Sequence, residues 1–155
     1  MRMNNMLVML VYGSIAFIQV QGFVFAGLSL RTTINELRTK YPLSLVIDQR
    51  VYLSDAERHD DISTIELSGA AGQRTLMLFF ERRENGEAVY PRCETLRATL
   101  ERRYGAPSSV QDATEEQARN RRFLWSNASE TLRLDCFAMP GQPLYAERTT
   151  MASGQ

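Results

Sequence analysis

The single histidine of the chain, His59, is the first residue whose type could support catalysis. It stands beside Asp60 and Asp61, and a histidine next to carboxylates could act as a general base or bind a metal ion. Adjacent residues of an extended segment point in different directions, however, and no second histidine completes the usual zinc set. We therefore keep these three residues as weak functional candidates in what we expect to be a solvated loop.

The sequence lacks the familiar motifs of enzymes. It contains no Gly-x-Ser-x-Gly, no Cys-x-x-Cys, no P-loop and no Gly-x-Gly-x-x-Gly. The sequence therefore leans against an enzyme and predicts no cofactor and no metal. A small envelope hydrolase that uses His59 with a carboxylate or serine stays an alternative.

A small basic cluster consists of Arg119, Arg121 and Arg122. It could meet an anionic partner, although an exposed strand edge guarded by charge is the simpler explanation. The 18 basic and 18 acidic side chains of the whole sequence balance, and the chain shows no clustered positive charge of the kind that nucleic acid requires. We expect no nucleic-acid partner.

The N-terminus has the three parts of a secretory signal peptide. Arg2 supplies the positive charge, an uncharged apolar run follows, and Val24 and Ala26 stand at minus three and minus one of a cut. The pattern predicts a signal peptide over residues 1–26 and a single domain over residues 27–155. We expect a periplasmic or secreted protein.

Two alternatives to this cut remain. Cleavage after Gly22 would place Val20 at minus three. An uncleaved segment could instead anchor the protein in the inner membrane, because residues 6–30 carry no charge and about 20 apolar residues span a bilayer. After cleavage no stable membrane span is expected.

The two cysteines, Cys93 and Cys136, are predicted to form a disulfide. Cys93 lies on the apolar face of a predicted helix, and Cys136 lies on the apolar face of a predicted strand. The helix face also holds Leu96, Leu100 and Tyr104, and the strand face holds Leu132 and Leu134. Export to an oxidising compartment favours the disulfide, and two buried thiols are the alternative.

Two helices are expected in the domain. The first covers residues 33–41, opened by a capping box of Thr33 and Glu36 and ended by Pro42. The second runs from Pro91, placed in its first turn, to a stop at Gly105.

The other segments are mostly extended. Strands are expected within residues 43–53, with a bend near Asp48, and in residues 63–67, 75–81, 121–126, 131–139 and 143–150. The apolar run 75–81 predicts a central strand covered on both faces or nearly so, Asn85-Gly86 predicts a turn, and residues 108–120 read as a polar loop. The fold class is α+β, with one or two helices packed on an antiparallel sheet.

A short internal similarity links the ends of the two predicted helices. Leu37-x3-Tyr41 resembles Leu100-x3-Tyr104, and in both cases strands follow. The match predicts two halves that each contain a helix and then strands, with coincidence as the alternative.

The opening LRTTINELRTKYP, the helix end Tyr-Gly-x-Pro and the late cysteine resemble small exported bacterial domains. The layout is similar to β-lactamase-inhibitor-like folds and to the small SmpA/OmlA lipoprotein of outer-membrane assembly, although no lipobox cysteine follows the apolar run. The resemblance implies a non-enzymatic module that binds another envelope protein. A small-molecule binder is a further alternative, and the sequence makes no prediction of the oligomeric state.

Overall fold

A computed structural model describes residues 22–70, 73–115 and 118–153 of the chain. The two helices are α1 (Ile34–Lys40) and α2 (Cys93–Tyr104). The first strands are β1 (Leu45–Ile47), β2 (Arg50–Tyr52), β3 (Ile62–Ser68), β4 (Thr75–Phe80), β5 (Arg82–Glu84) and β6 (Glu87–Val89). The later strands are β7 (Ser109–Glu115), β8 (Ala118–Ser126), β9 (Glu130–Ala138) and β10 (Tyr145–Ser153).

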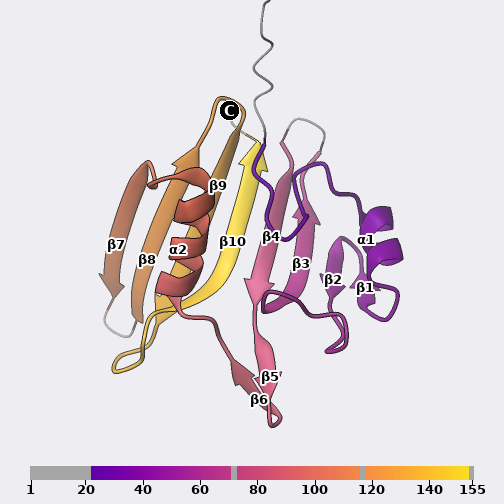
Figure 1. Ribbon diagram of the computed structural model, residues 1–155, viewed down its shortest axis with the longest axis horizontal. Coiled ribbons are helices and arrows are strands. Elements are labelled where there is room, and N and C mark those ends of the chain that lie inside the picture. Colours follow the sequence, from indigo (N-terminus) through magenta and orange to yellow (C-terminus); the bar gives the residue numbers. More distant parts are fainter. Residues whose placement is uncertain (1–21, 71–72, 116–117, 154–155) are drawn as a thin grey trace, which may run out of the picture.

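Eight strands form one antiparallel sheet in the order β1-β2-β3-β4-β10-β9-β8-β7. The strand order is symmetric about the central β4–β10 pair (Figure 1). Helix α1 is followed in the chain by β1 to β4, which lead from one edge of the sheet to its centre. Helix α2 is followed by β7 to β10, which lead from the other edge to the centre. The predicted α+β class and the expected arrangement of two halves are therefore confirmed. The β5–β6 hairpin stands outside this sheet and turns at Asn85-Gly86, as predicted.

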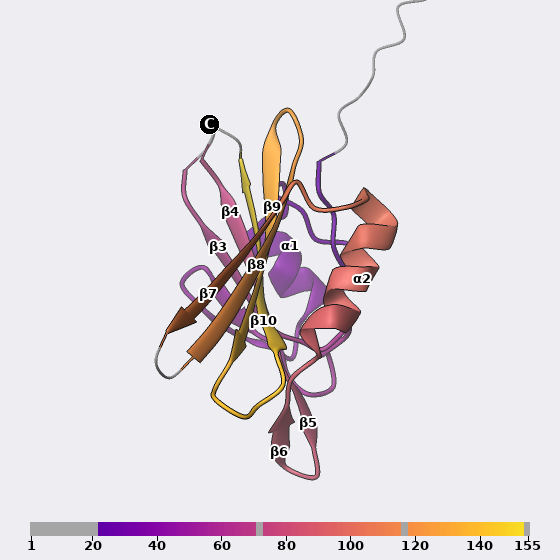
Figure 2. The ribbon, with the colours of Figure 1, turned by 90° about the vertical axis from the view of Figure 1, so that its left-hand side faces the viewer.

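One face of the sheet is covered and the other is open. Alternate side chains of the inner strands point into a single core beneath α1, α2 and the N-terminal segment, and Figure 2 shows α2 lying along this side. Strand β4 illustrates the alternation, since Leu76 and Leu78 are fully buried whereas Met77 and Phe79 are half-buried on the open face. The strand is central as predicted, but its second face lacks the expected cover.

Helix α1 forms where its capping box predicts. The Thr33 hydroxyl accepts a hydrogen bond from the Glu36 N–H, and the Glu36 carboxylate accepts one from the Thr33 N–H at 2.7 Å. These hydrogen bonds hold the pKa of Glu36 below its ordinary value. A helix of this length is marginal by itself, so the complete burial of Leu37 is what fixes it on the sheet.

Helix α2 is held by apolar contacts and by a covalent bond. Leu96 and Leu100 are buried, and Cys93 is joined to Cys136 of β9, with their Cα atoms 5.8 Å apart. The predicted disulfide is confirmed. The helix begins later than expected, because Arg92 is its N-cap and Pro91 precedes it; the Pro91 carbonyl instead accepts a hydrogen bond from Ala146 of β10 at 2.9 Å.

The prediction of a polar loop over residues 108–120 is wrong. Most of this segment forms β7 and the start of β8, paired from Ser109↔Leu124 to Glu115↔Ala118. The strand looks polar because it is an edge strand, in which Val110 is 52% exposed and few side chains meet the core. Pairing with β8 therefore decides its structure, and hydrophobic alternation could not reveal it.

The folded domain begins before Gly27. Phe23 and Phe25 are buried in the core, although the predicted cut after Ala26 would remove them. Residues 1–21, which hold most of the predicted signal peptide, lie outside the described residues. Within the part of the chain that is described, neither helix has the length and apolar character needed to cross a membrane.

Candidate protein-binding surface

The open face of the sheet is apolar at the end formed by β1 to β4. Cross-strand pairing places Leu45 beside Tyr52, and Tyr52 beside Thr64, which in turn pairs with Phe79. We call the apolar side chains of this region the apolar patch: Leu45, Ile47, Tyr52, Met77 and Phe79. Leu45 and Ile47 are 60% and 50% exposed, so the patch opens toward solvent at the β1 edge.

Beside the patch lies a hollow of about 310 Å³. Its walls include the aromatic side chains of Tyr52, Phe79 and Tyr90, together with Arg50. Tyr90 comes from the chain that leaves β6, and it reaches this place because its ring packs against Tyr145 of β10 at 6.0 Å. A hollow of this size, which we call the aromatic hollow, has room for one or two side chains of a partner.

Arg50 supplies a fixed positive charge at this site. Its Nε donates a hydrogen bond to the Glu66 carboxylate at 2.9 Å, and its Nη1 donates to the Tyr52 hydroxyl at 3.3 Å. These hydrogen bonds, the one to Tyr52 first, raise the pKa of Arg50. The hydrogen bond from Arg50 holds the Tyr52 hydroxyl, and tyrosine and arginine are enriched at protein-binding centres.

The open face is polar at its other end. The Asp135 carboxylate is 3% exposed and accepts hydrogen bonds from Arg122 Nε at 2.7 Å and from Arg133 Nε at 2.9 Å. The two guanidinium groups thus both form ion pairs with this carboxylate within the sheet. The arrangement explains how a buried carboxylate is tolerated here, and it leaves the β1 to β4 end as the apolar part of the face.

His59 is engaged in structural contacts. Its half-buried ring stacks on Tyr41 with centroids 5.6 Å apart, its Nε2 lies 3.3 Å from the Tyr41 hydroxyl, and its Nδ1 lies 3.3 Å from the Glu57 carbonyl oxygen. The carbonyl oxygen can only accept, so Nδ1 donates to it. Both ring nitrogens are occupied, and the residue ties the end of α1 to the loop before β3.

The serines near His59 in the fold, Ser44 and Ser54, bind Glu57. The Glu57 carboxylate accepts hydrogen bonds from the hydroxyls of Ser44 and Ser54 and from the Leu43 N–H. Partial burial by itself would raise the pKa of Glu57, but these three donors outweigh it and hold the pKa below its ordinary value. This loop is thus braced by hydrogen bonds on both sides.

Asp60 and Asp61 serve the turn that enters β3. Both have positive φ angles, of 50° and 60°, which aspartate tolerates better than most residues. Asp61 lies 4.0 Å from Arg82 of β5, and its carbonyl accepts a hydrogen bond from the Glu81 N–H. Within the described residues, no group of three or more histidine, cysteine, aspartate or glutamate side chains could hold a metal ion.

The sheet divides the predicted arginine cluster between its two faces. Arg119 and Arg121 lie on the helix side, whereas Arg122 lies on the open face with Asp135. The alternation of a strand already implies this separation, because neighbouring residues point to opposite faces. Only Arg119 and Arg121 can therefore act together.

A residue that sequence reasoning missed joins those two arginines. Arg92 lines the same hollow of about 430 Å³, which lies between the start of α2, strand β8 and the chain before β10. Arg121 is bound by Asp112 at 2.5 Å, and Arg119 donates to the Gln142 carbonyl at 3.3 Å. Glu94 also lines the hollow, so most of the positive charge is balanced locally.

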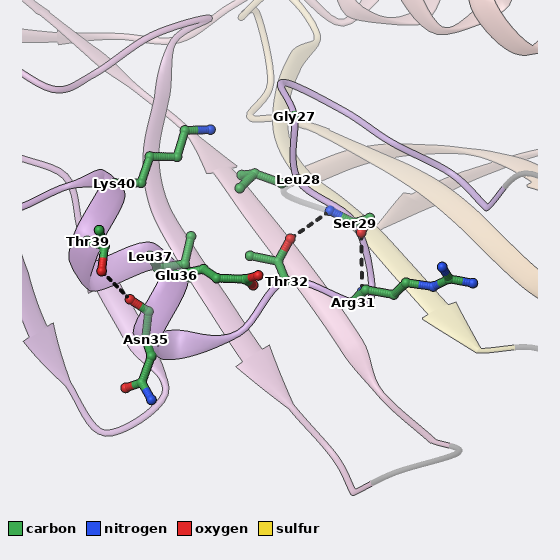
Figure 3. Close-up of a pocket in the computed structure, with 10 residues that line it drawn as sticks. All are labelled: Gly27, Leu28, Ser29, Arg31, Thr32, Asn35, Glu36, Leu37, Thr39 and Lys40. Atoms are coloured by element: carbon green, nitrogen blue, oxygen red, sulfur yellow. Dashed lines mark hydrogen bonds between the residues drawn. The ribbon is translucent and has the colours of Figure 1, made fainter.

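A hollow of about 680 Å³ lies along α1. Figure 3 shows that its walls come from one stretch, residues 27–40, and that several of their polar groups bond to one another. The Ser29 N–H donates to the Thr32 hydroxyl at 3.0 Å, and the Thr39 hydroxyl donates to the Asn35 carbonyl. It is not the deep apolar pocket between helix and sheet that a small-molecule binder would need.

The residues of the apolar patch were not recognised from the sequence. Leu43, Leu45 and Ile47 alternate with a period of two, and Val46 and Val51 are apolar as well, so both faces of this short edge hairpin are apolar. A strand with one face on the core needs apolar residues on that face only, so apolar residues on both faces were the pattern from which an exposed patch could have been predicted. No comparable pattern in the sequence marks Tyr90 as part of the aromatic hollow.

The fold and surface define an α+β domain of two halves with one open sheet face. Each half contributes one helix and four strands of the sheet. A comparison of the chain with protein-family models, with curated proteins and with solved structures finds no match.

Proposed function

We propose that the protein is an exported adaptor domain that binds another protein of the cell envelope through the apolar patch and the aromatic hollow. The observation that supports this most is the gathering of exposed apolar side chains on the open face. Leu45, Ile47, Tyr52 and Tyr90 are each at least 38% exposed, and Leu43, two residues before Leu45 in the chain, is 69% exposed. Such patches on otherwise polar surfaces mark interaction sites.

The mixture of side chains favours a separate partner over a second copy of the chain. Permanent homodimer interfaces resemble a core cut in half and exclude charge. This face instead combines the patch with the Arg50–Glu66 ion pair and with the polar end around Asp135. We therefore expect an association that forms and dissociates, with an apolar side chain of the partner in the aromatic hollow.

Export to the periplasm, or secretion, is part of the proposal. The basic and apolar N-terminus supports it, and so does the Cys93–Cys136 disulfide, because such bonds persist in oxidising compartments. The resemblance of the sequence layout to β-lactamase-inhibitor-like folds adds an argument from analogy. Anchoring to the inner membrane by an uncleaved N-terminal segment is the alternative mode of export; Phe23, Phe25 and Leu28 lie in the folded core, so such a segment would have to end before them.

The test is site-specific photocrosslinking in the cell envelope. A photoreactive phenylalanine analogue at Tyr52 should yield one reproducible crosslinked partner, and the same analogue at Val110, an exposed residue on the distant edge strand β7, should not. Equal crosslinking from both positions, or none from Tyr52, would contradict the proposed surface. A crosslinked dimer of this chain would contradict the separate partner.

A further inference from the structure

The segment that opens the folded domain is anchored by its aromatic side chains. The Phe23 ring packs edge-on against Tyr104 of α2 with centroids 5.0 Å apart, and the Phe25 ring packs in the same way on Phe80 of β4 at 5.9 Å. Both phenylalanines belong to the core, with exposed fractions of 5% and 7%. A mature chain that starts at Gly27 would lack both of them.

The backbone of this segment is bound as firmly as its side chains. The Tyr104 hydroxyl accepts a hydrogen bond from the Val24 N–H at 3.0 Å and donates one to the Val24 carbonyl. Phe25 and Leu28 exchange two backbone hydrogen bonds of 2.9 and 2.8 Å. The folded domain therefore uses Phe23, Val24, Phe25 and Leu28, either for the side chain or for the backbone.

A carboxylate marks the point at which this segment begins. The Glu130 side chain, at the start of β9, accepts a hydrogen bond from the Phe23 N–H at 2.7 Å. The same carboxylate crowds Gly22, since a Cβ atom there would lie 2.5 Å from Glu130 Oε1. The backbone nitrogen of Phe23 is thus the atom that faces a negative charge.

We propose that the leader is removed between Gly22 and Phe23, and that the new α-ammonium group of Phe23 pairs with Glu130. A signal peptidase would add water across the Gly22–Phe23 amide, leaving a carboxylate on Gly22 and an amine on Phe23 that takes up a proton. Gly22 and Val20 provide the small residues that such a cut requires at minus one and minus three. The product keeps the whole anchored segment and places a positive charge 2.7 Å from a carboxylate oxygen.

This inference rests on the export that the proposed function includes, and it is tested with the full chain in a bacterial host that processes signal peptides. The wild-type protein should be recovered with Phe-Val-Phe-Ala-Gly as its N-terminal sequence. Gly22→Leu should block processing and accumulate the precursor, whereas the matched variant Ala26→Leu should be processed like the wild type. A mature chain that starts at Gly27, or processing blocked by Ala26→Leu alone, would overturn the inference.

The same experiment separates a wrong cut from a failure of export. An unprocessed chain in the cytoplasmic fraction with two free thiols would contradict export and thus the proposed function as well. An unprocessed chain held in the membrane with the Cys93–Cys136 disulfide formed would overturn the cut alone. A mature chain cut elsewhere would leave export intact.

The ion pair has a separate readout. In the processed protein, Glu130→Gln should increase the rate at which an aminopeptidase releases Phe23 several-fold, because the terminus loses its charged partner. Glu101→Gln, which removes a carboxylate bonded to Arg97 on α2, is the matched control and should leave the rate unchanged. Equal rates for Glu130→Gln and the wild type would overturn the pairing.

Discussion

The two halves of the sheet share one layout and differ in how they are fastened. Leu37 and Leu100 are both fully buried, and Tyr41 and Tyr104 follow them at the ends of α1 and α2. Helix α2 is joined to the sheet by a disulfide, whereas the end of α1 is held by hydrogen bonds among loop residues.

The two halves also differ in the residues that they present on the open face of the sheet. The half with the disulfide presents charges that are paired with one another, and the half without it presents the apolar patch. Covalent rigidity and exposed apolar surface thus lie at opposite ends of one sheet. The comparison suggests that the second half stabilises the fold while the first half is free to bind, and the following predictions test that division.

The largest effect is expected from the disulfide. The variant Cys93→Ser/Cys136→Ser should lose about 4 kcal/mol of unfolding free energy, because the bond closes a loop with a sequence separation of 43 residues. Denaturant unfolding of the variant and of reduced wild type should agree. A loss below about 1 kcal/mol would show that the second half needs no covalent fastening.

The two buried leucines test whether both helices matter for the core. Leu37→Ala and Leu100→Ala should each lower the unfolding free energy by about 3 kcal/mol, since both side chains are fully buried. Leu43→Ala, at a position that is 69% exposed, is the control and should change it by less than about 0.5 kcal/mol. A negligible effect of Leu37→Ala would mean that α1 adds little to the first half.

Acid should loosen the first half through Glu57. Because the folded-state pKa of Glu57 is lowered, its stabilising effect is present above its ordinary pKa and is lost as the pH falls through the folded value. The difference in unfolding free energy between wild type and Glu57→Gln should therefore shrink below about pH 4. A difference that stays constant from pH 7 to pH 3 would contradict the role of the carboxylate in bracing this loop.

The smallest effect on stability is expected at the apolar patch. Tyr52→Ala should change the unfolding free energy by less than about 1 kcal/mol, because the side chain is 38% exposed. The same substitution should weaken capture of the partner about tenfold or more, as expected for a central aromatic residue. A variant that keeps full partner capture would move the binding site away from this half.

Much of the fold could be predicted because it depends on local patterns. The capping box of Thr33 and Glu36, the apolar face that carries Cys93 and the alternation around Cys136 each reveal their element within a few residues of sequence. Strand β7 could not be predicted in this way, because an edge strand buries little and its polar residues resemble a loop. The binding surface was missed for a related reason: Tyr52, Phe79 and Tyr90 are apolar residues like many others until the sheet brings them together.

The sequence by itself determined the class of fold, the cysteine pair and the positions of the helices, because short-range spacing governs capping, periodicity and burial. Only the tertiary structure decided which face of the sheet stays open and that Phe23 and Phe25 belong to the core. These outcomes depend on contacts between residues far apart in the chain, such as Phe23 with Tyr104 and Glu130. No local pattern encodes contacts of that kind, since they arise when separate elements compete to cover the same apolar surface.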